Sequence, residues 1–199
     1  CSSDLVLGSM PPRKSPTVFL FASVIWPTSS GVALPGFNTD TTPLAPMLTS
    51  VTSGSIVIDG VPRAFEAQGL IDDSAGYHAR RTDWEWSAGV GALTDGRAVV
   101  WNLVQGVHDA TTASERTVWV DGREHEVGPV TFLPGLAGCA FAEGGELRCA
   151  IESERSRSDN LGLFASDYRQ PFGTFSGTLP GAGDLAEGYG VMEEHSVRW

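Results

Sequence analysis

The sequence is poor in lysine and in positive charge. Lys14 is the only lysine among 13 basic residues, and 24 acidic residues bring the formal net charge to −11. Proteins that bind nucleic acid or an anionic membrane surface usually carry a basic patch, so this balance argues against both partners. The apolar run at residues 17–26 is too short to span a bilayer, and we expect no membrane span. Arginine in place of lysine is typical of a GC-rich bacterial genome.

Cysteine is also scarce, with only Cys1, Cys139 and Cys149 present. If the two glycines between the last two cysteines form a two-residue hairpin loop, Cys139 lies opposite Ala150. The two thiols are then offset neighbours on opposite faces of the sheet, where a disulfide does not fit without backbone movement. We therefore expect free thiols and a cytoplasmic location.

Residues 1–49 differ in composition from the rest of the chain. They hold four charged residues, whose charges cancel, while residues 50–199 hold the other 33. Residues 1–5 (Cys-Ser-Ser-Asp-Leu) resemble a translated sequencing adapter, which predicts a fragment from assembled metagenomic DNA with an artefactual amino end. For residues 17–26, a signal-peptide core, a buried strand and an out-of-frame reading stay open. We expect residues 1–49 to be unreliable or disordered and residues 50–199 to form an antiparallel β domain.

From residue 50 onward the sequence alternates strand and turn patterns, with little helical periodicity. Asp-Gly or Gly-Gly pairs predict four hairpins, at residues 59–60, 95–96, 121–122 and 144–145. Residues 77–93 predict one long strand, bulged or bent at Gly89 or Gly91. Residues 155–158 (Arg-Ser-Arg-Ser) are interpreted as a solvated loop. The predicted fold class is all-β, an antiparallel barrel or sandwich built from consecutive hairpins.

One face of the strand at residues 77–87 carries an unusual mixture of side chains. Alternate residues of a strand share a face, and this face holds His78, Arg80, Thr82, Trp84 and Trp86. The opposite face is mostly polar and charged, so the tryptophan face should point inward. A buried arginine without a partner is costly, so we expect Arg80 to meet a carboxylate or to line a wet cavity.

Other strands place aromatic and ionisable residues on one face in the same way. The predicted members of the same site are Asn102, Glu115, Trp119, Glu193, His195 and Trp199. If these strands are neighbours, their side chains line a mixed polar and apolar pocket of the kind that binds small molecules.

Each of these residues can instead have a purely structural role. The tryptophans can be plain core residues, Arg80 can form a structural ion pair, and His195 can lie on the surface. A metal site built from His78, Glu193 and His195 lacks closely spaced ligands, so we expect no metal and no cofactor.

Four stretches of the chain resemble an uncharacterised bacterial family, a domain of unknown function. They are residues 73–89 (Asp-Ser-Ala-Gly-Tyr-His-Ala-Arg-Arg-Thr-Asp-Trp-Glu-Trp-Ser-Ala-Gly), 102–106, 114–122 and 190–199. The family is similar in fold to tandem lipocalin-like proteins, which include carotenoid hydratases, tocopherol cyclase and AttH-like proteins. The resemblance implies a lipocalin-like fold and a chain that forms the carboxy-terminal half of a tandem β protein. The family carries no established activity to transfer.

Three functions are compatible with the sequence. The first is acid–base chemistry on a small apolar or isoprenoid-like molecule, as in a hydratase, cyclase or isomerase. Glu115 or Glu193 would donate a proton, a tryptophan would stabilise the cation, and His78 or His195 would position water or accept the proton. The second is a carrier or sensor that binds such a ligand without catalysis. The third is a structural half-domain that docks on the missing amino-terminal half of the same protein.

Overall fold

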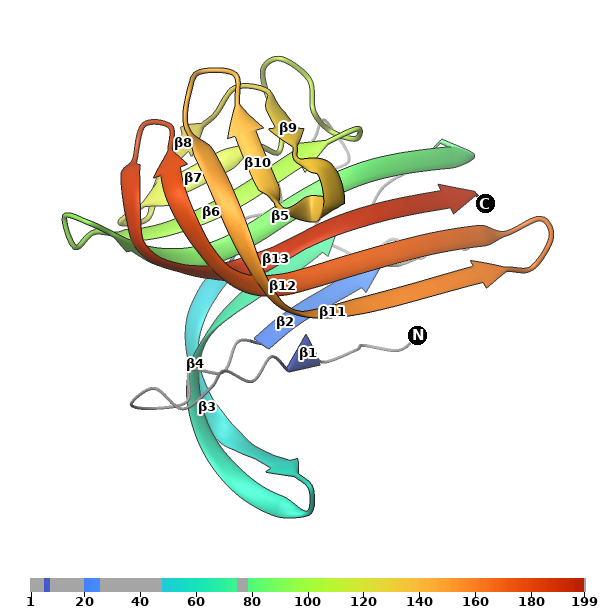
Figure 1. Cartoon of the computed structure of the whole chain (residues 1–199), viewed down its shortest axis with the longest axis horizontal. Coiled ribbons are helices and arrows are strands. Elements are labelled where there is room, and N and C mark those ends of the chain that lie inside the picture. Colours follow the sequence, from blue (N-terminus) through green and yellow to red (C-terminus); the bar gives the residue numbers. More distant parts are fainter. Residues whose placement is uncertain (1–5, 8–19, 26–47, 75–78, 199) are drawn as a thin grey trace, which may run out of the picture. The chain divides into compact units, whose positions relative to one another are not determined.

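The computed structural model describes residues 6–7, 20–25, 48–74 and 79–198, which are almost entirely β-strand (Figure 1). The chain divides into two compact units, Cys1–His78 and Ala79–Trp199. Within the described ranges the only helical element is one 3-10 turn, η1 (Pro134–Leu136). The predicted all-β class is confirmed. In these ranges no helix has the length and apolar character needed to cross a membrane.

The first unit contains a four-stranded sheet in the order β1-β2-β4-β3. Its strands are β1 (Val6–Leu7), β2 (Leu20–Ile25), β3 (Leu48–Ile58) and β4 (Val61–Ser74). The predicted hairpin at Asp59 and Gly60 joins β3 to β4, and both residues have positive φ, 52° and 78°. Strand β2 pairs with β4 in parallel. The change of composition at residue 50 falls inside β3.

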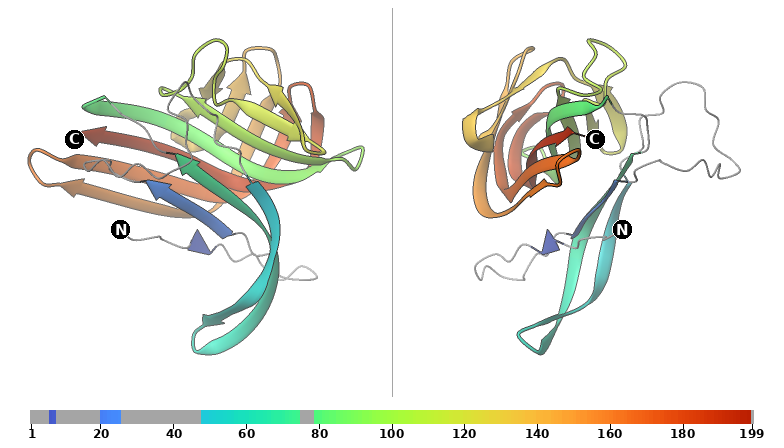
Figure 2. Two further views of the ribbon diagram at one scale, coloured as in Figure 1. Left: turned by 180° about the vertical axis from the view of Figure 1, so that it is seen from behind. Right: turned by 90° about the vertical axis from the view of Figure 1, so that its right-hand side faces the viewer.

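The second unit is one antiparallel sheet of nine strands, in the order β8-β7-β6-β5-β13-β12-β11-β10-β9. Its strands are β5 (Arg81–Leu93), β6 (Ala98–Gln105), β7 (Thr117–Val120), β8 (Arg123–Glu126), β9 (Val130–Phe132), β10 (Gly138–Phe141), β11 (Glu146–Asn160), β12 (Ala165–Leu179) and β13 (Gly183–Arg198). The sheet curls into a half-barrel (Figure 2). Strand β5 pairs with β6 along the chain but with β13 from the far end of the sequence.

The hydrophobic core of the second unit is built mainly from residues of β5 to β7, β9 to β13 and η1. Trp101 is fully buried there, and its indole N–H donates to Ser87 Oγ at 3.1 Å. A Cβ atom on Gly89 would lie 2.1 Å from the Trp101 ring, so this glycine makes room for the indole. The bulge expected at Gly89 or Gly91 was wrong, because the register irregularity of this pair lies on β13, between Leu185 and Glu187.

The predicted register around the two cysteines was wrong. The turn is longer than two residues, since Phe141 N donates to Gly145 O at 3.1 Å. Cys139 therefore lies opposite Leu147, and Cys149, two residues further on, projects from the same face. Both Cys139 and Cys149 are free thiols, as expected, and Cys1 lies outside the described residues. Burial raises the pKa of both thiols to about 12, so both are protonated at neutral pH.

The loop predicted at residues 155–158 was also wrong. These residues belong to β11, which pairs with β12 as far as Asn160. Most side chains from Ile151 to Asn160 are exposed whichever way they point. A strand with solvent on both faces shows no apolar alternation, which is why the sequence pattern missed it.

Candidate functional site

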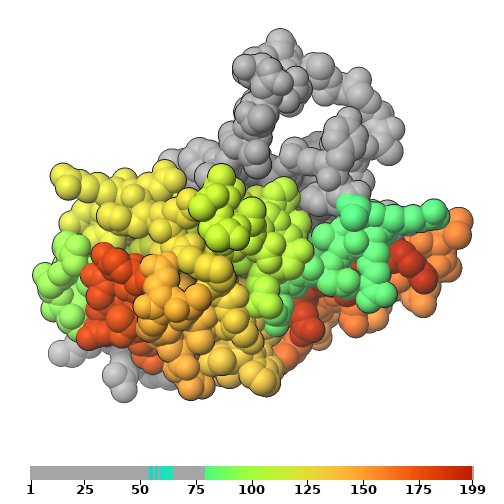
Figure 3. Space-filling view, turned by 90° about the horizontal axis from the view of Figure 1, so that it is seen from above, coloured from blue at the N-terminus to red at the C-terminus, as the bar shows by residue number. Residues whose placement is uncertain are grey.

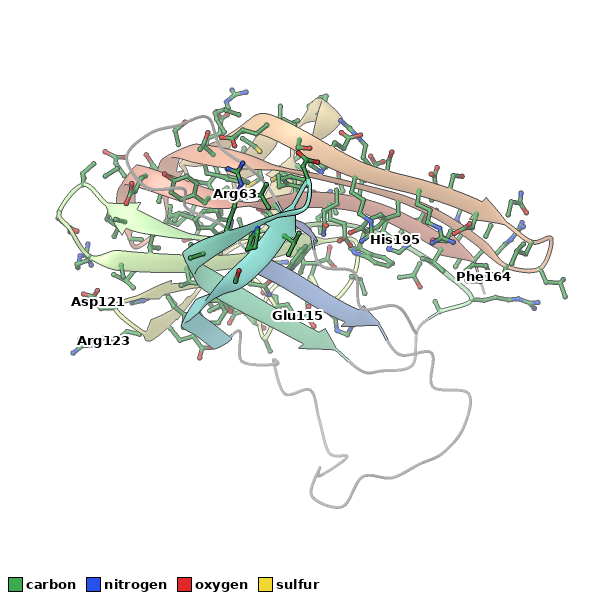
Figure 4. The ribbon with its side chains drawn as sticks, turned by 90° about the horizontal axis from the view of Figure 1, so that it is seen from below. Arg63, Glu115, Asp121, Arg123, Phe164 and His195 are labelled. Atoms are coloured by element: carbon green, nitrogen blue, oxygen red, sulfur yellow. The ribbon has the colours of Figure 1, made fainter. Side chains whose placement is uncertain are left out.

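The most distinctive arrangement of polar and aromatic groups lies where β5, β13 and β12 run side by side. His195 of β13 lies opposite Trp84 on one neighbour and opposite Tyr168 on the other. Its ring is 4.4 Å from the Trp84 ring and 5.0 Å from the Tyr168 ring, measured between centroids. Together with Ser166 these residues form what we call the His195 cluster (His195 is labelled in Figure 4). The structure thus brings together Trp84 and His195, two of the predicted site residues.

His195 is nearly buried, with 8% of its surface exposed. Its Nε2 lies 2.9 Å from Ser166 Oγ, whereas its Nδ1 is buried and has no hydrogen-bond partner among the described residues. Burial lowers the pKa of His195 to about 4, against a smaller opposing effect of the Asp167 carboxylate. At neutral pH the ring is therefore uncharged, and its buried Nδ1 makes no hydrogen bond within the described residues.

Because of His195, we expect the protein to become less stable as the pH is lowered. The imidazole is neutral in the folded chain down to about pH 4, but in the unfolded chain it takes up a proton near its ordinary pKa of 6.5. Above about pH 6.5 the histidine does not lower the free energy of unfolding. As the pH falls from 6.5 toward 4, the free energy of unfolding declines by about 2–3 kcal/mol. Urea unfolding across this range measures the decline. A His195→Gln variant should lose most of this pH dependence, and an unchanged slope in that variant would contradict the assignment.

Glu193 is the buried carboxylate next to this cluster, with 6% of its surface exposed. Its Oε1 accepts a hydrogen bond from Trp84 Nε1 at 2.9 Å, and its Oε2 accepts one from Gln170 Nε2 at 3.0 Å. An ionised carboxylate only accepts hydrogen bonds, so two N–H donors match that form. The contacts suit a carboxylate that holds the indole of Trp84 in place better than an acid that releases a proton.

Asn102 organises the neighbouring part of the same face. Its Oδ1 accepts from Trp86 Nε1 at 2.6 Å, and its Nδ2 donates to the backbone carbonyl of Glu115 at 2.8 Å. The two predicted ligand contacts Trp86 and Asn102 are thus joined directly. Trp119 lies one strand further along, opposite Val100, and is partly buried.

The structure does not bring the two predicted catalytic carboxylates together. Glu115 precedes β7, and three strand spacings separate β7 from the β13 strand that carries Glu193, or about 14 Å along the sheet. The side chain of Glu115 lies 3.6 Å from Nδ1 of His108 and is about one-third exposed (labelled in Figure 4). We therefore place Glu115 outside the His195 cluster.

Two of the remaining predicted residues, Arg80 and Thr82, lie at the start of β5. Arg80 precedes β5 and is exposed, so it does not carry the cost of burial that the sequence pattern suggested. Thr82 is the second residue of β5, and its hydroxyl donates to the carbonyl of Ala79 at 3.1 Å. His78 and Trp199 lie outside the described residues.

Sequence reasoning missed three residues on β12. Ser166, Tyr168 and Gln170 alternate along one face, which is a strand signal. Their side chains are polar, so the stretch shows no apolar alternation and no strand was predicted over these residues. The guanidinium of Arg155 on β11 lies 5.7 Å from the Tyr168 ring, a cation–π contact that continues the same row of side chains.

No metal centre is formed within the part of the chain that the structure describes. There, no group of three or more His, Cys, Asp or Glu side chains is arranged to hold a metal ion.

Comparison with known proteins gives a family match but no assigned activity. Residues 47–136 match the model of a family described as a domain of unknown function, DUF2804. The match includes the strands of Trp84, Trp86 and Asn102, and it ends before β12 and β13, which carry the other members of the site. No curated protein and no solved structure matches the chain.

Proposed function

We propose that this protein binds a small, mainly apolar molecule at the His195 cluster and acts as a carrier or sensor. The observation that carries the proposal is the buried Nδ1 of His195, which has no partner among the described residues. Buried polar atoms in folded proteins are nearly always hydrogen-bonded, so an open one marks the place of a missing partner.

The surroundings of this nitrogen define the kind of ligand. The rings of Trp84 and Tyr168 on either side offer apolar contact area, and the neutral imidazole offers one hydrogen bond. Because the Ser166 hydroxyl can donate to Nε2 or accept from it, Nδ1 can serve as donor or acceptor. A ligand with an apolar body and one hydroxyl, carbonyl or amine group fits this combination.

Acid–base chemistry on an apolar or isoprenoid-like molecule is the second candidate. It is supported by the neutral base His195 beside the Trp84 ring, whose face can stabilise a positive charge. It is supported less well by Glu193, because both of its oxygens accept hydrogen bonds from N–H groups, an arrangement that favours the ionised carboxylate over a proton donor. Carriage or sensing therefore agrees better with the contacts.

The proposal also includes the cellular compartment and a partner of this chain. Two free cysteine thiols agree with a reducing, cytoplasmic compartment of a bacterium. A lipocalin-like relationship agrees with ligand binding by a curled antiparallel sheet, and the amino-terminal half of a tandem protein would then be a partner of this chain.

Binding can be tested with the uncharged fluorescent probe N-phenyl-1-naphthylamine, which is apolar and carries one N–H group. We expect the full chain to bind the probe and His195→Phe to weaken binding about tenfold, the value of one hydrogen bond. His125→Phe is the matched control, because His125 is exposed on β8, and it should leave the dissociation constant unchanged.

Native mass spectrometry of the purified protein would identify a retained cellular ligand. Equal probe binding by the wild type and the His195→Phe variant would exclude the His195 cluster as the site. Conversion of the identified ligand during incubation, lost in His195→Phe but kept in His125→Phe, would favour the enzymatic alternative.

A further inference from the structure

We propose that β3, the edge strand of the first unit, pairs with β3 of a second copy of this chain, independently of the ligand site. Among the described strands, β3 pairs only with β4, and no irregularity interrupts that pair. The 11 residues Leu48–Ile58 include no charge and no proline, and more than half of them are β-branched. Natural sheets protect long edges with charges, prolines, bulges or short length, and β3 uses none of these.

The turn at Asp59 and Gly60 determines which backbone groups of β3 point outward. Both residues have positive φ, as in a type I′ turn, so the flanking residues Ile58 and Val61 exchange hydrogen bonds with each other. Because the pairing alternates regularly, the even-numbered residues of β3 direct their N–H and C=O groups toward β4. The odd-numbered residues, from Thr49 to Val57, direct theirs away from the sheet.

The position of these outward groups permits a symmetric pair. The midpoint of β3 is Ser53, which is one of the outward residues. A two-fold axis through Ser53 lets two antiparallel copies of β3 overlap along their whole length, with about ten backbone hydrogen bonds between them. In this register Thr49 lies opposite Val57 and Val51 lies opposite Ser55, so no charged residue of β3 meets another.

The strands at the other ends of the two sheets do not offer such a contact. Strands β1 and β9 have only two and three residues. Strand β8 lies at the surface of the second unit (yellow in Figure 3). Its turn, at Asp121 and Gly122, directs the backbone groups of Glu124 and Glu126 outward. Every two-fold antiparallel pairing of β8 then puts a glutamate opposite a glutamate, which destabilises the pair.

Charges around β3 do not oppose the contact strongly. Glu66 of β4 lies opposite Ser53, so the two copies of Glu66 would be three strand spacings, about 14 Å, apart. Asp59 of one copy and Asp72 of the other would be separated by two spacings, at least about 10 Å. Exposed charges are screened over about 10 Å at an ionic strength near 0.1 M. Arg63, labelled in Figure 4, adds a positive charge on β4.

The proposed pairing stops at two copies. It joins the two four-stranded sheets into one sheet through β3, and the outer edges of that sheet are then the two copies of β1. A strand of two residues is too short to add a third copy, so the assembly is a closed dimer.

Analytical ultracentrifugation of the full chain tests the proposal. We expect a monomer–dimer equilibrium with a dissociation constant of about 10 μM, as is typical of a small interface. Ser53→Lys puts two positive charges directly opposite each other at the axis and should raise this constant about fivefold. An equimolar mixture of the Ser53→Lys and Ser53→Glu variants should form a mixed dimer more strongly than either variant dimerises alone.

Ser55→Lys is the matched control, since it makes the same substitution on the same strand. Ser55 lies opposite Val51 in the proposed register, so its two copies would be about 14 Å apart. This variant should dimerise like the wild type. Equal weakening by Ser53→Lys and Ser55→Lys, or failure of the mixed dimer to form, would contradict the register.

Amide exchange of the wild type gives a readout that needs no substitution. Between about 1 μM and about 100 μM protein, exchange should slow at the odd-numbered amides of β3 and change less at the even-numbered ones, which are already bonded to β4. A chain that stays monomeric at the higher concentration would overturn the proposal and leave this edge to a strand of another protein. So would a dimer in which the odd-numbered amides exchange as fast as in the monomer.

Discussion

Replacing Trp101 with alanine should lower the free energy of unfolding by about 3–5 kcal/mol, the range for removing a large aromatic side chain from a core. Trp101 has no exposed surface, its N–H is bonded to Ser87 Oγ, and its ring packs 5.1 Å from that of Phe175. Removal leaves a cavity that neighbouring strands cannot fill, since their hydrogen bonds fix the backbone. Urea unfolding measures the loss, and Trp119→Ala, at a partly buried position, should cost clearly less.

A second substitution, at Gly89, tests whether close packing against the Trp101 ring contributes to stability. The backbone of Gly89 lies against the indole, so Gly89→Ala should destabilise the chain by about 1–3 kcal/mol through overpacking. In a Trp101→Phe background the smaller ring gives the new methyl group more room. Gly89→Ala should then destabilise the chain less than in the wild type. Some destabilisation should remain, because the carbonyl of Tyr189 still lies 2.5 Å from the position of the new Cβ. If the free-energy changes of Gly89→Ala and Trp101→Phe simply add in the double variant, the two residues do not interact and this account is contradicted.

Replacing Arg116 with methionine should destabilise the second unit by about 3 kcal/mol. Arg116 is 1% exposed, and its guanidinium donates to the backbone carbonyls of Asp109, Ala110 and Val127. Methionine keeps most of the apolar stem, so the change isolates the loss of these charged hydrogen bonds. The carbonyls lose their donors, and the loop before β7 loses its attachment to the sheet.

Two measurements distinguish the loss of the Arg116 hydrogen bonds from a nonspecific loss of stability. Arg123→Met, at an exposed position of β8, should change the free energy of unfolding by less than about 0.5 kcal/mol. In Arg116→Met, amide exchange should accelerate at Glu115, whose N–H donates to the carbonyl of His108, before it accelerates in the core strands. A stability loss below about 1 kcal/mol would show that water replaces the guanidinium at little cost.

Local sequence signals predicted much of the second unit. The Asp-Gly pairs do join strands, with positive φ at Asp121 and Gly122 as at the first hairpin. Alternation correctly placed Trp84 and Trp86 on one face, and it placed Glu193 and His195 on the face that meets them. Such signals succeed because a strand has a period of two and a tight turn needs particular residues, which are properties of a few neighbouring positions.

The candidate site depended on information that no local signal contains. Glu193 and Trp84 are bonded although 109 positions separate them, because β13 inserts beside β5 at the centre of the sheet. Gln170 and Ser166 lie in the site because they belong to β12, whose polar first half carries no apolar alternation that would predict a strand. The inward position expected for Arg80 was wrong, because this residue lies before the first residue of β5 and is exposed.

The sequence by itself determined the all-β class, the hairpin turns and the residues that share a face of the strand from Arg81 to Leu93. The tertiary structure decided which strands are neighbours, and with that the open Nδ1 of His195, the paired oxygens of Glu193 and the separation of Glu115 from both. The physical reason is the range of the forces involved. Turn chemistry and side-chain alternation act over two to four residues, whereas strand order results from the joint burial of apolar surface across the whole sheet.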